Sequence, residues 1–437
     1  MTSIDLVSAL FKALRDITDQ PYPVVTAKNT AKRASVALVV RINPSYAHWS
    51  EEEQNKPTSL EEFLERDWVQ HGDPEVLFIK RAARKGDRWT SHIALPGGRR
   101  DPEDADDEAA AVRETSEEVG LDLEKYSLRC GNLPQRIVTT HWGKKPLLVL
   151  CPYVYILTTH NVPPLKLQPT EVASTHWVPV RSLLSEERRT VVFEDVSSRI
   201  ANQETGVRKW MLSMILGKMM FAAINLAPTE SLHSRESPAP QLQTQDNRYA
   251  RNTAYFSLQA LAKRAYTSDI FGQHPAHPPE VPLLLWGLTL GVIADFLDLL
   301  PPHNALTLWS YPTFTPLDVR LTIAVMTYRF KNRKRAELQA GTTLPGDPLD
   351  PDDKMRRAFG GVSESMVIVE RPDETGFHGL GTGLGAGENK SKKAAVSTML
   401  DGYYDIVRQA VATALVGRLG VATLVGVLAW RRWNDRL

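Results

Sequence analysis

The segment from Leu95 to Leu121 constrains this chain more than any other, because it places glutamates at helical spacing behind a double glycine. Residues three and four positions apart share one face of a helix, so the sequence predicts that Glu114, Glu117 and Glu118 direct their carboxylates toward one point. Carboxylates gathered in this way repel one another unless a cation lies among them, and such hard oxygen ligands suit Mg²⁺ or Mn²⁺. The segment therefore predicts a divalent-metal site on a helix.

The residues on either side of this helix support that interpretation. Gly97 and Gly98 allow a sharp bend, because glycine has no Cβ, and the bend can bring the Gly97 carbonyl close to the ion. Arg113 lies on the adjacent flank, and Gly120 is suited to end the helix. The alternative interpretation is a solvated acidic helix with a glycine C-cap. Such a helix rarely also carries the two glycines, the Arg-Glu pair and the terminal glycine in register.

The run from Arg113 to Gly120 resembles the closing portion, REx(2)EExG, of the Nudix box. This box is the loop–helix–loop signature of enzymes that hydrolyse nucleoside diphosphates linked to another group. The resemblance implies an α/β fold, a Nudix-type α/β/α sandwich with a mixed sheet, and a hydrolase that acts on acid anhydrides. It also implies that Glu114 and Glu118 are the best metal ligands and that Glu117 completes the cluster.

The same resemblance assigns a role to each residue of the box. Arg113 would orient a glutamate through a bidentate pair, braced by Asp104 or Glu103, and one of the glutamates or a loop glutamate would be the general base. The expected catalytic residues are Arg113, Glu114, Glu117 and Glu118, the expected metal ligands are Gly97, Glu114, Glu117 and Glu118, and the expected supporting loop residues are Gly98, Asp101, Asp104 and Gly120. Glu171 is a weaker candidate to approach the metals. His92 and His176 have no partner at ligand spacing, so both are expected to be structural.

The acidic loop narrows the substrate class. The segment from Gly98 to Arg113 is one residue longer than in the general Nudix pattern, and Asp104 stands where that pattern has glutamate. The subgroup acting on coenzyme A shares this extra residue and reads roughly GGxxDxxD before the helix, which Gly97, Gly98, Asp101 and Asp104 fit. The resemblance to this subgroup implies coenzyme A or an acyl-CoA as the substrate.

The upstream residues fit this subgroup only in part. Arg81 and the alanine after it match its Arg-Ala step, and Arg84 and Arg88 supply basic side chains, so these three arginines are expected to bind substrate. The spacing of the basic residue and the glycine departs from the subgroup signature, and Leu95 replaces its usual Phe. NADH, ADP-ribose or another dinucleotide is therefore the alternative substrate. An alternative of another class is a catalytically silent, membrane-associated scaffold that senses nucleotides.

Composition bounds the class of protein and its compartment. A net charge of +1 and a pI near 7.8 argue against a polyanion-binding protein, so the expected partner is a small nucleotide substrate and no nucleic acid. Cys130 and Cys151, the only cysteines, lie in apolar runs, which indicates a reducing intracellular compartment. The N-terminus has an amphipathic apolar stripe and lacks the features of a signal peptide. A homodimer is compatible with the sequence.

The patterns along the chain predict both elements and domains. Strands are expected at 35–40, 76–79, 147–157 and 171–180, and helices at the N-terminus and at 59–69, 207–227, 283–300 and 317–330. The expected parts are an N-terminal helix and lead-in (1–34), a Nudix hydrolase core (35–227), a polar low-complexity insertion (228–282), a helical completion of the catalytic domain with a basic flank (283–340), a flexible linker (341–395) and a C-terminal apolar helix (396–437).

The C-terminal segment 411–430 is nearly all apolar, broken only by Arg418. A helix of this length could cross a hydrocarbon core at about 1.5 Å per residue. A central arginine costs about 2.5–3.5 kcal/mol on insertion, which favours a helix packed on the domain, so both interpretations stay open. If the segment inserts, the catalytic domain faces the cytosol, and mitochondria, peroxisomes and the endoplasmic reticulum all fit as the anchoring organelle.

Overall fold

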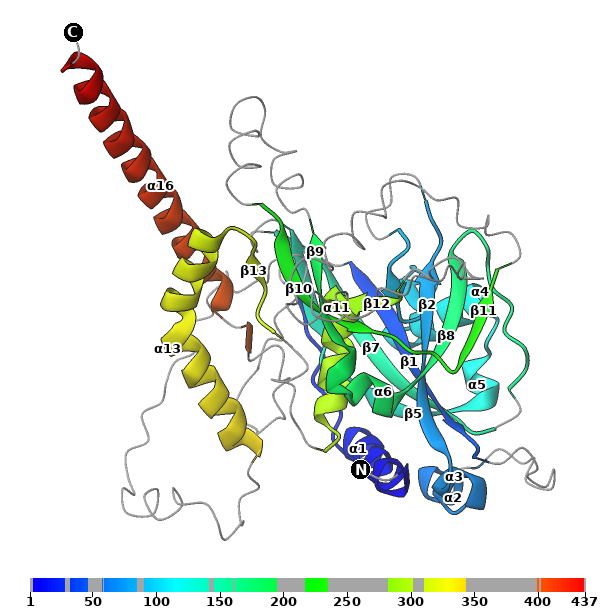
Figure 1. The fold of residues 1–437 in the computed structure, drawn as a ribbon. Coiled ribbons are helices and arrows are strands. Elements are labelled where there is room, and N and C mark those ends of the chain that lie inside the picture. The colour runs from blue at the N-terminus through cyan, green and yellow to red at the C-terminus, as the bar shows by residue number, and fades with distance from the viewer. Residues whose placement is uncertain are drawn as a thin grey trace, which may run out of the picture.

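The structure is a computed structural model that describes residues 3–27, 32–45, 57, 59–84, 90–140, 145–159, 162–194, 217–234, 282–301, 310–342, 399–400 and 402–435. Over these residues the chain forms a nine-stranded sheet between two layers of helices, with a four-stranded sheet beside it (Figure 1). The expected substrate-binding Arg88, residues 207–216 of the expected helix and most of the expected linker lie outside the described residues.

The large sheet is mixed. Its strands are β1 (Arg33–Asn43), β2 (Asp73–Arg81), β3 (Ile93–Ala94), β4 (Gly97–Arg99), β5 (Ser127–Asn132), β6 (Arg136–Thr140), β7 (Lys145–Leu157), β8 (Val172–Pro179) and β11 (Glu230–His233). The order is β11-β8-β2-β1-β7-β5, with β3 beside β2, β4 beside β1 and β6 beside β7. β1 and β7 run parallel, whereas β1 is antiparallel to β2 and β4.

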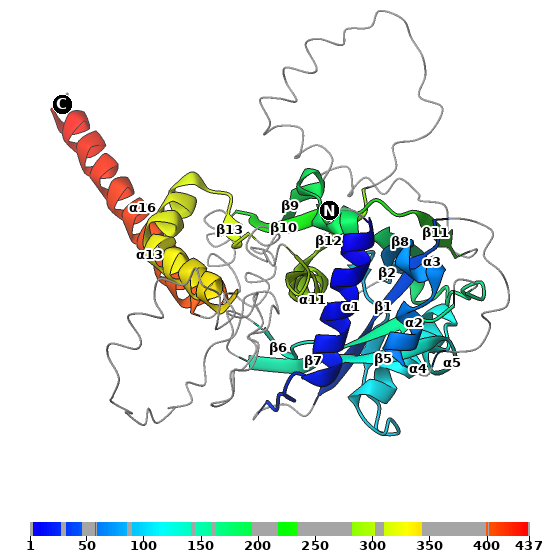
Figure 2. The same ribbon diagram turned by 90° about the horizontal axis from the view of Figure 1, so that it is seen from below.

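Alternation along β1 divides the core into two layers. Leu38 and Val40 join the cluster that contains α1 (Ser3–Asp19), α2 (Leu60–Leu64), α3 (Asp67–Gln70), α6 (Val180–Leu184) and α11 (Gly287–Asp298). Ala37 and Val39 join the cluster on the opposite face, under α4 (Asp107–Val119) and α5 (Leu123–Tyr126). α1 and α11 lie side by side in both ribbon views (Figures 1 and 2). This arrangement confirms the predicted α/β/α sandwich.

In the small sheet, strands stand where parts of two helices were predicted. β10 (Met219–Asn225) lies at its centre and pairs with β9 (Arg189–Glu194), β12 (Leu284–Trp286) and β13 (Thr313–Phe314). The end of the helix predicted over 207–227 is therefore a strand. A strand buried on both faces has a continuous apolar run, which periodicity alone does not distinguish from a buried helix. The helix predicted over 283–300 is wrong at its start, because β12 precedes Gly287, whose φ is 69°.

Other differences from the predicted elements are smaller. The first residues of the expected polar insertion form β11, which pairs with β8. The helix expected at 59–69 is two short helices, and Ser59 caps the first by accepting a hydrogen bond from the Glu62 N–H at 3.1 Å. Cys130 and Cys151 are buried free thiols, as predicted.

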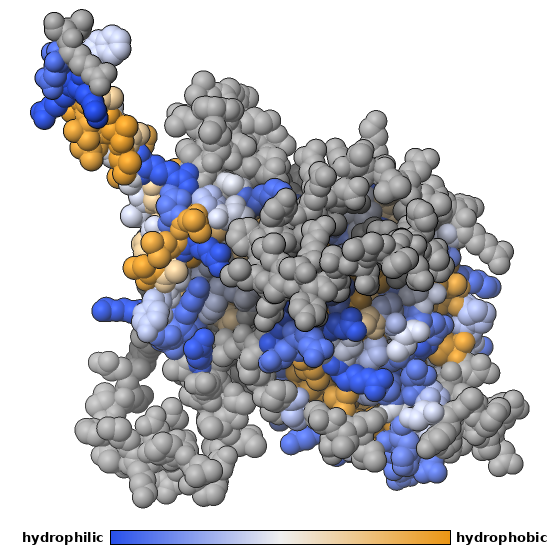
Figure 3. All heavy atoms as spheres, viewed as in Figure 1, coloured by the Kyte–Doolittle hydropathy of each residue, from blue (hydrophilic) through white to orange (hydrophobic). Residues whose placement is uncertain are grey.

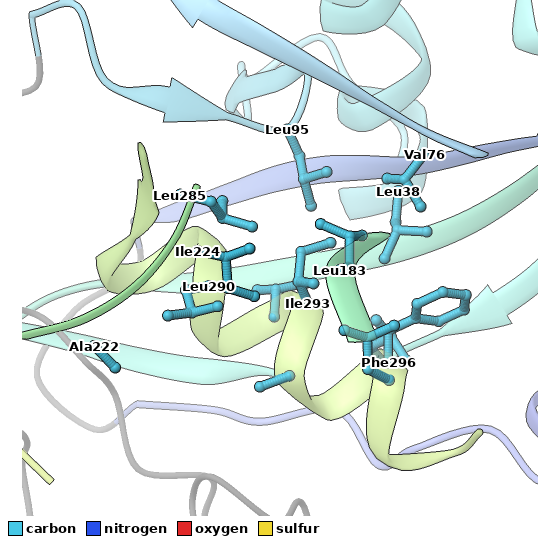
Figure 4. Packing of buried hydrophobic residues seen from close by; sticks show 14 of the residues in the cluster. Leu38, Val76, Leu95, Leu183, Ala222, Ile224, Leu285, Leu290, Ile293 and Phe296 are labelled. Atoms are coloured by element: carbon cyan, nitrogen blue, oxygen red, sulfur yellow. The ribbon is translucent and has the colours of Figure 1, made fainter. Parts of the chain in front are cut away.

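α11 completes the core below the loop that carries the double glycine. Ile293 of α11 lies among Leu95, Leu183 and Ile224 (Figure 4). Burying these side chains joins the segment around residue 290 to the rest of the core through hydrophobic contact.

A buried ion pair also fixes α11. The guanidinium of Arg136 in β6 is fully buried, pairs with the Asp295 carboxylate of α11 and donates from Nη2 to the Gly291 carbonyl at 2.8 Å. A Cβ at Gly291 would lie 2.4 Å from Nη1 of Arg136, so a larger residue here would displace the paired guanidinium. The pair ties the edge of the large sheet to α11 at two points.

Two long helices project from the body. α13 (Leu317–Thr342) packs along α16 (Tyr403–Asn434), and the chain directions are antiparallel, because Phe330 is beside Tyr403 and Asp318 pairs with Arg418. Both helices include the apolar runs that the sequence predicts. The C-terminal part of α16 extends away from the rest of the molecule (Figure 1).

Candidate active site

The Nudix-like segment folds as a loop followed by α4, which ends at Gly120 as the sequence predicts. Asp106 caps the start by accepting a hydrogen bond from the Ala109 N–H at 2.8 Å. Gly120 ends the helix with a φ of 70°, and its N–H donates to the Ser116 carbonyl at 2.9 Å. A Cβ at Gly120 would lie 2.8 Å from Cβ of Lys166, which adds a steric reason for glycine to the conformational one.

Arg113 is braced by Asp104, as the sequence predicts. Its Nε and Nη2 donate to the two Asp104 carboxylate oxygens at 2.9 and 3.0 Å, a bidentate geometry that lysine cannot reproduce. The hydrogen bond from Arg113 holds the pKa of Asp104 below its ordinary value. Nη2 also donates to the Arg99 carbonyl at 3.2 Å and to Oε1 of Glu114 at 3.3 Å. The arginine therefore joins the acidic loop to the glutamate face of α4.

Glu118 is held against the glycine loop. Its Oε2 accepts a hydrogen bond from the Gly97 N–H at 2.9 Å, and the residue is only 1% exposed. Burial raises the pKa of Glu118 to about 7, against the lowering effects of the Gly97 hydrogen bond and the Arg81 charge. The structure thus assigns Gly97 a contact to Glu118 through its N–H, whereas the predicted contact of its carbonyl with an ion stays a prediction.

Glu114 lies beside Glu118 and against Gly98. Burial is also the main cause that raises the pKa of Glu114, and the Arg113 charge opposes it. An ideal Cβ on Gly98 would lie 2.4 Å from the Glu114 carboxylate. Gly98 is therefore the residue that leaves room for this carboxylate.

Glu117 is paired with Arg113 at the flank of α4. Its side chain is 58% exposed and accepts a hydrogen bond from Nη1 of Arg113 at 2.9 Å. The predicted place of Glu117 among the metal ligands therefore stays a prediction, and in this structure its carboxylate is paired with Arg113. The i, i+4 pair with Arg113 draws the Glu117 carboxylate to the flank of α4.

A divalent cation fits the chemistry of the two inner glutamates. Among the described residues, no group of three or more His, Cys, Asp and Glu side chains converges closely enough to hold an ion. After burial, the charge of Glu114 is one of the causes that raise the pKa of Glu118. A positive ion beside these carboxylates would offset both the desolvation and the repulsion, so the donor set fits Mg²⁺ or Mn²⁺.

Glu171, a weaker candidate from the sequence, lies near the inner glutamates of α4. After burial, its charge contributes to the raised pKa values of both Glu114 and Glu118, so it lies near their carboxylates. Arg84 holds it, with Nη2 donating to Oε1 at 2.7 Å and Nε donating to the Thr170 carbonyl at 2.8 Å. The available signal was its place as the first residue of the strand predicted at 171–180, which carries no information about distance to α4.

The remaining expected residues are Arg81, on β2, and the aspartates of the acidic loop. Arg81 lies near Glu118, and its N–H donates to the His92 carbonyl at 3.0 Å. Asp101 and Asp104 close the acidic loop, with the Asp101 N–H donating to Oδ2 of Asp104 at 2.8 Å. The site therefore collects Arg81, Arg84 and the loop around the glutamates.

The two histidines have structural surroundings, in agreement with the prediction. The His92 ring packs on Trp286 at 4.9 Å between centroids. The ring nitrogens of His176 are bonded to the hydroxyls of Ser174 and Ser231 at 2.9 and 2.8 Å. Burial lowers the pKa of His176 to about 4, so this ring is neutral near pH 7.

The structure is a sandwich of this kind with a braced glutamate helix, and comparison with known proteins identifies its family. A model of the NUDIX domain matches residues 50–196. An uncharacterized protein of Schizosaccharomyces pombe is 30% identical over 318 residues, which cover 71% of this chain and 79% of that protein. The chain belongs to the Nudix superfamily and is a Nudix hydrolase.

Two further similarities are more limited. The mitochondrial coenzyme A diphosphatase NUDT8 of Mus musculus is 41% identical over 54 residues, which cover 12% of this chain and 26% of that protein. The NUDIX domain of Shewanella oneidensis NrtR, solved with ADP-ribose, is 15% identical, with 38% of this chain and 82% of that chain covered. Its TM-score of 0.23 is too low to support a structural comparison.

Proposed function

We propose that this protein hydrolyses the pyrophosphate bond of coenzyme A or an acyl-CoA, with Mg²⁺ or Mn²⁺ as cofactor. The observation that carries the proposal is the buried Glu118 carboxylate, held by the Gly97 N–H beside Glu114. Such a pair of desolvated carboxylates is suited to bind a divalent ion at the phosphates of a substrate.

Glu114 and Glu118 would hold the ion, and Glu117 and the Gly97 carbonyl are further proposed ligands. A bound ion of this kind lowers the pKa of its water and neutralises charge on phosphate oxygens. Arg113, fixed by Asp104, positions the Glu114 carboxylate through its Nη2 hydrogen bond. In this proposal Arg113, Glu114, Glu117 and Glu118 are the catalytic set.

Glu171 is the loop glutamate best placed to receive a proton from the attacking water. It lies near the carboxylates of Glu114 and Glu118, and its ion pair with Arg84 fixes its side chain. A general base needs hydrogen-bond reach to the water, which a side chain held beside the inner glutamates can provide. Glu114, Glu117 and Glu118 remain the other candidates for this role.

The support for coenzyme A comes from two sources. The acidic loop has the extra residue of the coenzyme A subgroup, and Asp104, which replaces the usual glutamate, makes the bidentate contact with Arg113. The limited similarity to the coenzyme A diphosphatase NUDT8 points in the same direction. Arg81 and Arg84, beside the glutamates, are proposed to contact the phosphates.

A substrate panel tests the choice of substrate. Full-length protein is incubated with coenzyme A, acetyl-CoA, NADH, ADP-ribose and capped RNA, each with Mg²⁺ or Mn²⁺, and the products are identified by mass spectrometry. We expect coenzyme A or its acyl form to have the highest kcat/KM. Cleavage of a dinucleotide with coenzyme A left intact would show that the subgroup assignment is wrong and that the alternative substrate class applies.

The silent-scaffold alternative makes a different prediction for the same panel. It is motivated by the long exposed part of α16, which a soluble enzyme does not need. Nucleotide binding by calorimetry, without product for any substrate or metal, would favour it over hydrolysis.

We further propose that the protein is intracellular and associates with an organelle membrane, with the catalytic domain in the cytosol. Among the helices that the structure describes, α16 alone is both long enough and apolar enough to cross a membrane. Mitochondria, peroxisomes and the endoplasmic reticulum are the proposed locations. Helix composition alone is weak support, because buried helices of soluble proteins share it, so the position of α16 in the fold matters.

Replacing Gly98 by alanine is expected to lower kcat about tenfold or more while changing the unfolding free energy little. The added Cβ would displace the end of a flexible side chain, the Glu114 carboxylate, which the site uses. Gly97→Ala is the contrasting variant, in which the neighbouring glycine is replaced and a loss of stability is expected. Its Cβ would lie 2.2 Å from the Ser35 carbonyl oxygen at a φ of 144°, so this variant should be unstable. Full activity in Gly98→Ala would remove Glu114 from the proposed site.

A further inference from the structure

The first turns of α16 belong to the hydrophobic core of the protein. Their buried residues are Tyr403, Tyr404, Val407, Ala410, Val411 and Ala414. The hydroxyl of Tyr403 also donates to the Pro312 carbonyl at 2.6 Å. We call this part, residues 403–414, the root of α16. Because the root is buried, α16 does not begin as a free tail.

Beyond the root, α16 is apolar and exposed. No charged side chain occurs from Leu419 to Trp430, and the Thr423 hydroxyl is satisfied within the helix by the Leu419 carbonyl at 2.8 Å. Leu424 is 59% exposed and Trp430 is 66% exposed. Figure 3 shows this end of the helix as an apolar rod that projects clear of the body. We call residues 415–430 the rod.

The large apolar side chains of the rod surround most of its axis. At 100° per residue, Val416, Leu419, Leu424, Val425 and Leu428 do not fall on one narrow stripe. Two copies packed as a coiled coil would need such a stripe. A helix that is apolar on nearly all sides instead fits an environment that is apolar on all sides, which is the interior of a bilayer.

α13 contacts α16 at two places, at the start of the root and at the base of the rod. Near the start of α16, the centroids of the Phe330 and Tyr403 rings are 6.2 Å apart, and the Lys331 ammonium lies 5.7 Å from the centroid of the Tyr403 ring. Near the base of the rod, Nη2 of Arg418 donates to Oδ1 of Asp318 at 2.6 Å. The arginine that interrupts the apolar run is therefore paired with a carboxylate at the point where α13 begins.

We propose that the rod enters a lipid bilayer while the root stays packed against α13, so that the catalytic domain is fixed directly on the membrane surface without a flexible tether. This inference deepens the membrane association proposed above and does not depend on the substrate. Leu317 and Leu321 of α13, exposed beside Arg418, lie at the membrane surface in this arrangement. Asp318 neutralises Arg418 at the same level.

The length of the rod also limits the thickness of membrane that it can span. From Leu419, the first residue beyond Arg418, to Trp430 the helix is about 18 Å long at roughly 1.5 Å per residue, shorter than a typical hydrocarbon core of about 30 Å. Arg431, Arg432 and Trp433 follow it, which are residue types suited to the far headgroup layer. Long arginine side chains can reach outward from a short span. We therefore expect tighter binding to vesicles of short-chain than of long-chain phosphatidylcholine.

Cysteine labelling can test this arrangement in the full-length chain. Burial raises the pKa of both natural thiols, Cys130 and Cys151, to about 12, so they react slowly with a water-soluble maleimide. Three single substitutions then report on separate surfaces: Leu424→Cys on the rod, Ile323→Cys on the buried face of α13, and Tyr328→Cys on its exposed face. Labelling rates are compared with and without vesicles of phosphatidylcholine and phosphatidylserine.

We expect vesicles to slow the labelling of Leu424→Cys by about tenfold or more, because the rod leaves water. Ile323→Cys should stay slow and Tyr328→Cys should stay fast under both conditions. Leu424→Asp should lower the vesicle partition coefficient on the order of 10²-fold, whereas Tyr328→Asp should leave it unchanged.

Three results would overturn the proposal. Fast labelling of Ile323→Cys on vesicles would mean that the root leaves α13 and the anchor is a flexible tether. Fast labelling of Leu424→Cys on vesicles would mean that the rod does not insert. Slow labelling of Leu424→Cys without vesicles, in a species that is dimeric by light scattering, would mean that a second copy covers the rod.

Discussion

Replacing Glu118 by glutamine is expected to lower kcat on the order of 10²-fold or more and to leave the fold intact. The amide keeps the size of the side chain, and its oxygen can still accept the Gly97 N–H. Burial raises the pKa of Glu118 to about 7, so the folded protein already disfavours the charged form. A neutral replacement therefore costs little stability while removing the ligand charge. Both kcat and the unfolding midpoint should be measured.

Glu117→Gln is expected to give a loss on the order of 10²-fold as well, because the proposed metal cluster includes its carboxylate. Its exposed position beside Arg113 makes it a separate test of the cluster. Glu103→Gln, an exposed change in the acidic loop, is the matched control and should retain activity. Unchanged activity in both Glu117→Gln and Glu118→Gln would remove these residues from the site.

Replacing Asp295 by alanine should lower the free energy of unfolding by about 3–5 kcal/mol, because it leaves the buried Arg136 guanidinium without its counter-ion. The loss should be visible as a shift in urea unfolding. Since the pair holds α11 against the edge of the sheet, the change should also weaken the packing below Leu95. This is the largest stability effect that we expect from a single substitution far from α4.

A double variant separates the buried charge from the loss of packing. Arg136→Met combined with Asp295→Leu replaces the ion pair by apolar side chains of similar volume, which is often neutral or stabilising. We expect it to recover most of the stability that Asp295→Ala loses. A change of less than about 0.5 kcal/mol in Asp295→Ala would contradict this role, because that is the ordinary effect of a surface substitution.

The sequence predicted the parts of the fold that depend on local patterns. Gly120 ends α4 where the box places it, and β1 includes the strand expected at 35–40. The brace between Arg113 and Asp104 was also predicted, because the residues are close in the chain and their chemistry is specific. Such features need little information from distant residues.

The features that the sequence could not predict depend on distant contacts. β10 is a strand because β9, β12 and β13 surround it, and its own apolar run fits a helix equally well. The partners Arg136 and Asp295 are 159 positions apart, so no spacing rule connects them. Glu171 reaches the site through the fold of β8, far along the chain from α4.

Because the root of α16 is part of the core, truncating the C-terminus removes core residues together with the rod. A chain that ends at Asp401 would lose Tyr403 and Val407 from the core along with the rod. Loss of membrane binding in such a chain would not distinguish a missing anchor from a damaged domain. Substitutions on the exposed rod, such as Leu424→Asp, leave the root in place.

The most direct test of the central claim is hydrolysis of coenzyme A by full-length protein in water enriched in the heavy oxygen isotope. We predict that phosphopantetheine and adenosine 3′,5′-bisphosphate form with Mg²⁺ or Mn²⁺ and that one of the two new phosphate groups carries the label. Product should be absent with a chelator and reduced on the order of 10²-fold in Glu118→Gln. Coenzyme A left intact with both metals, or product formation that Glu118→Gln does not change, would contradict the account.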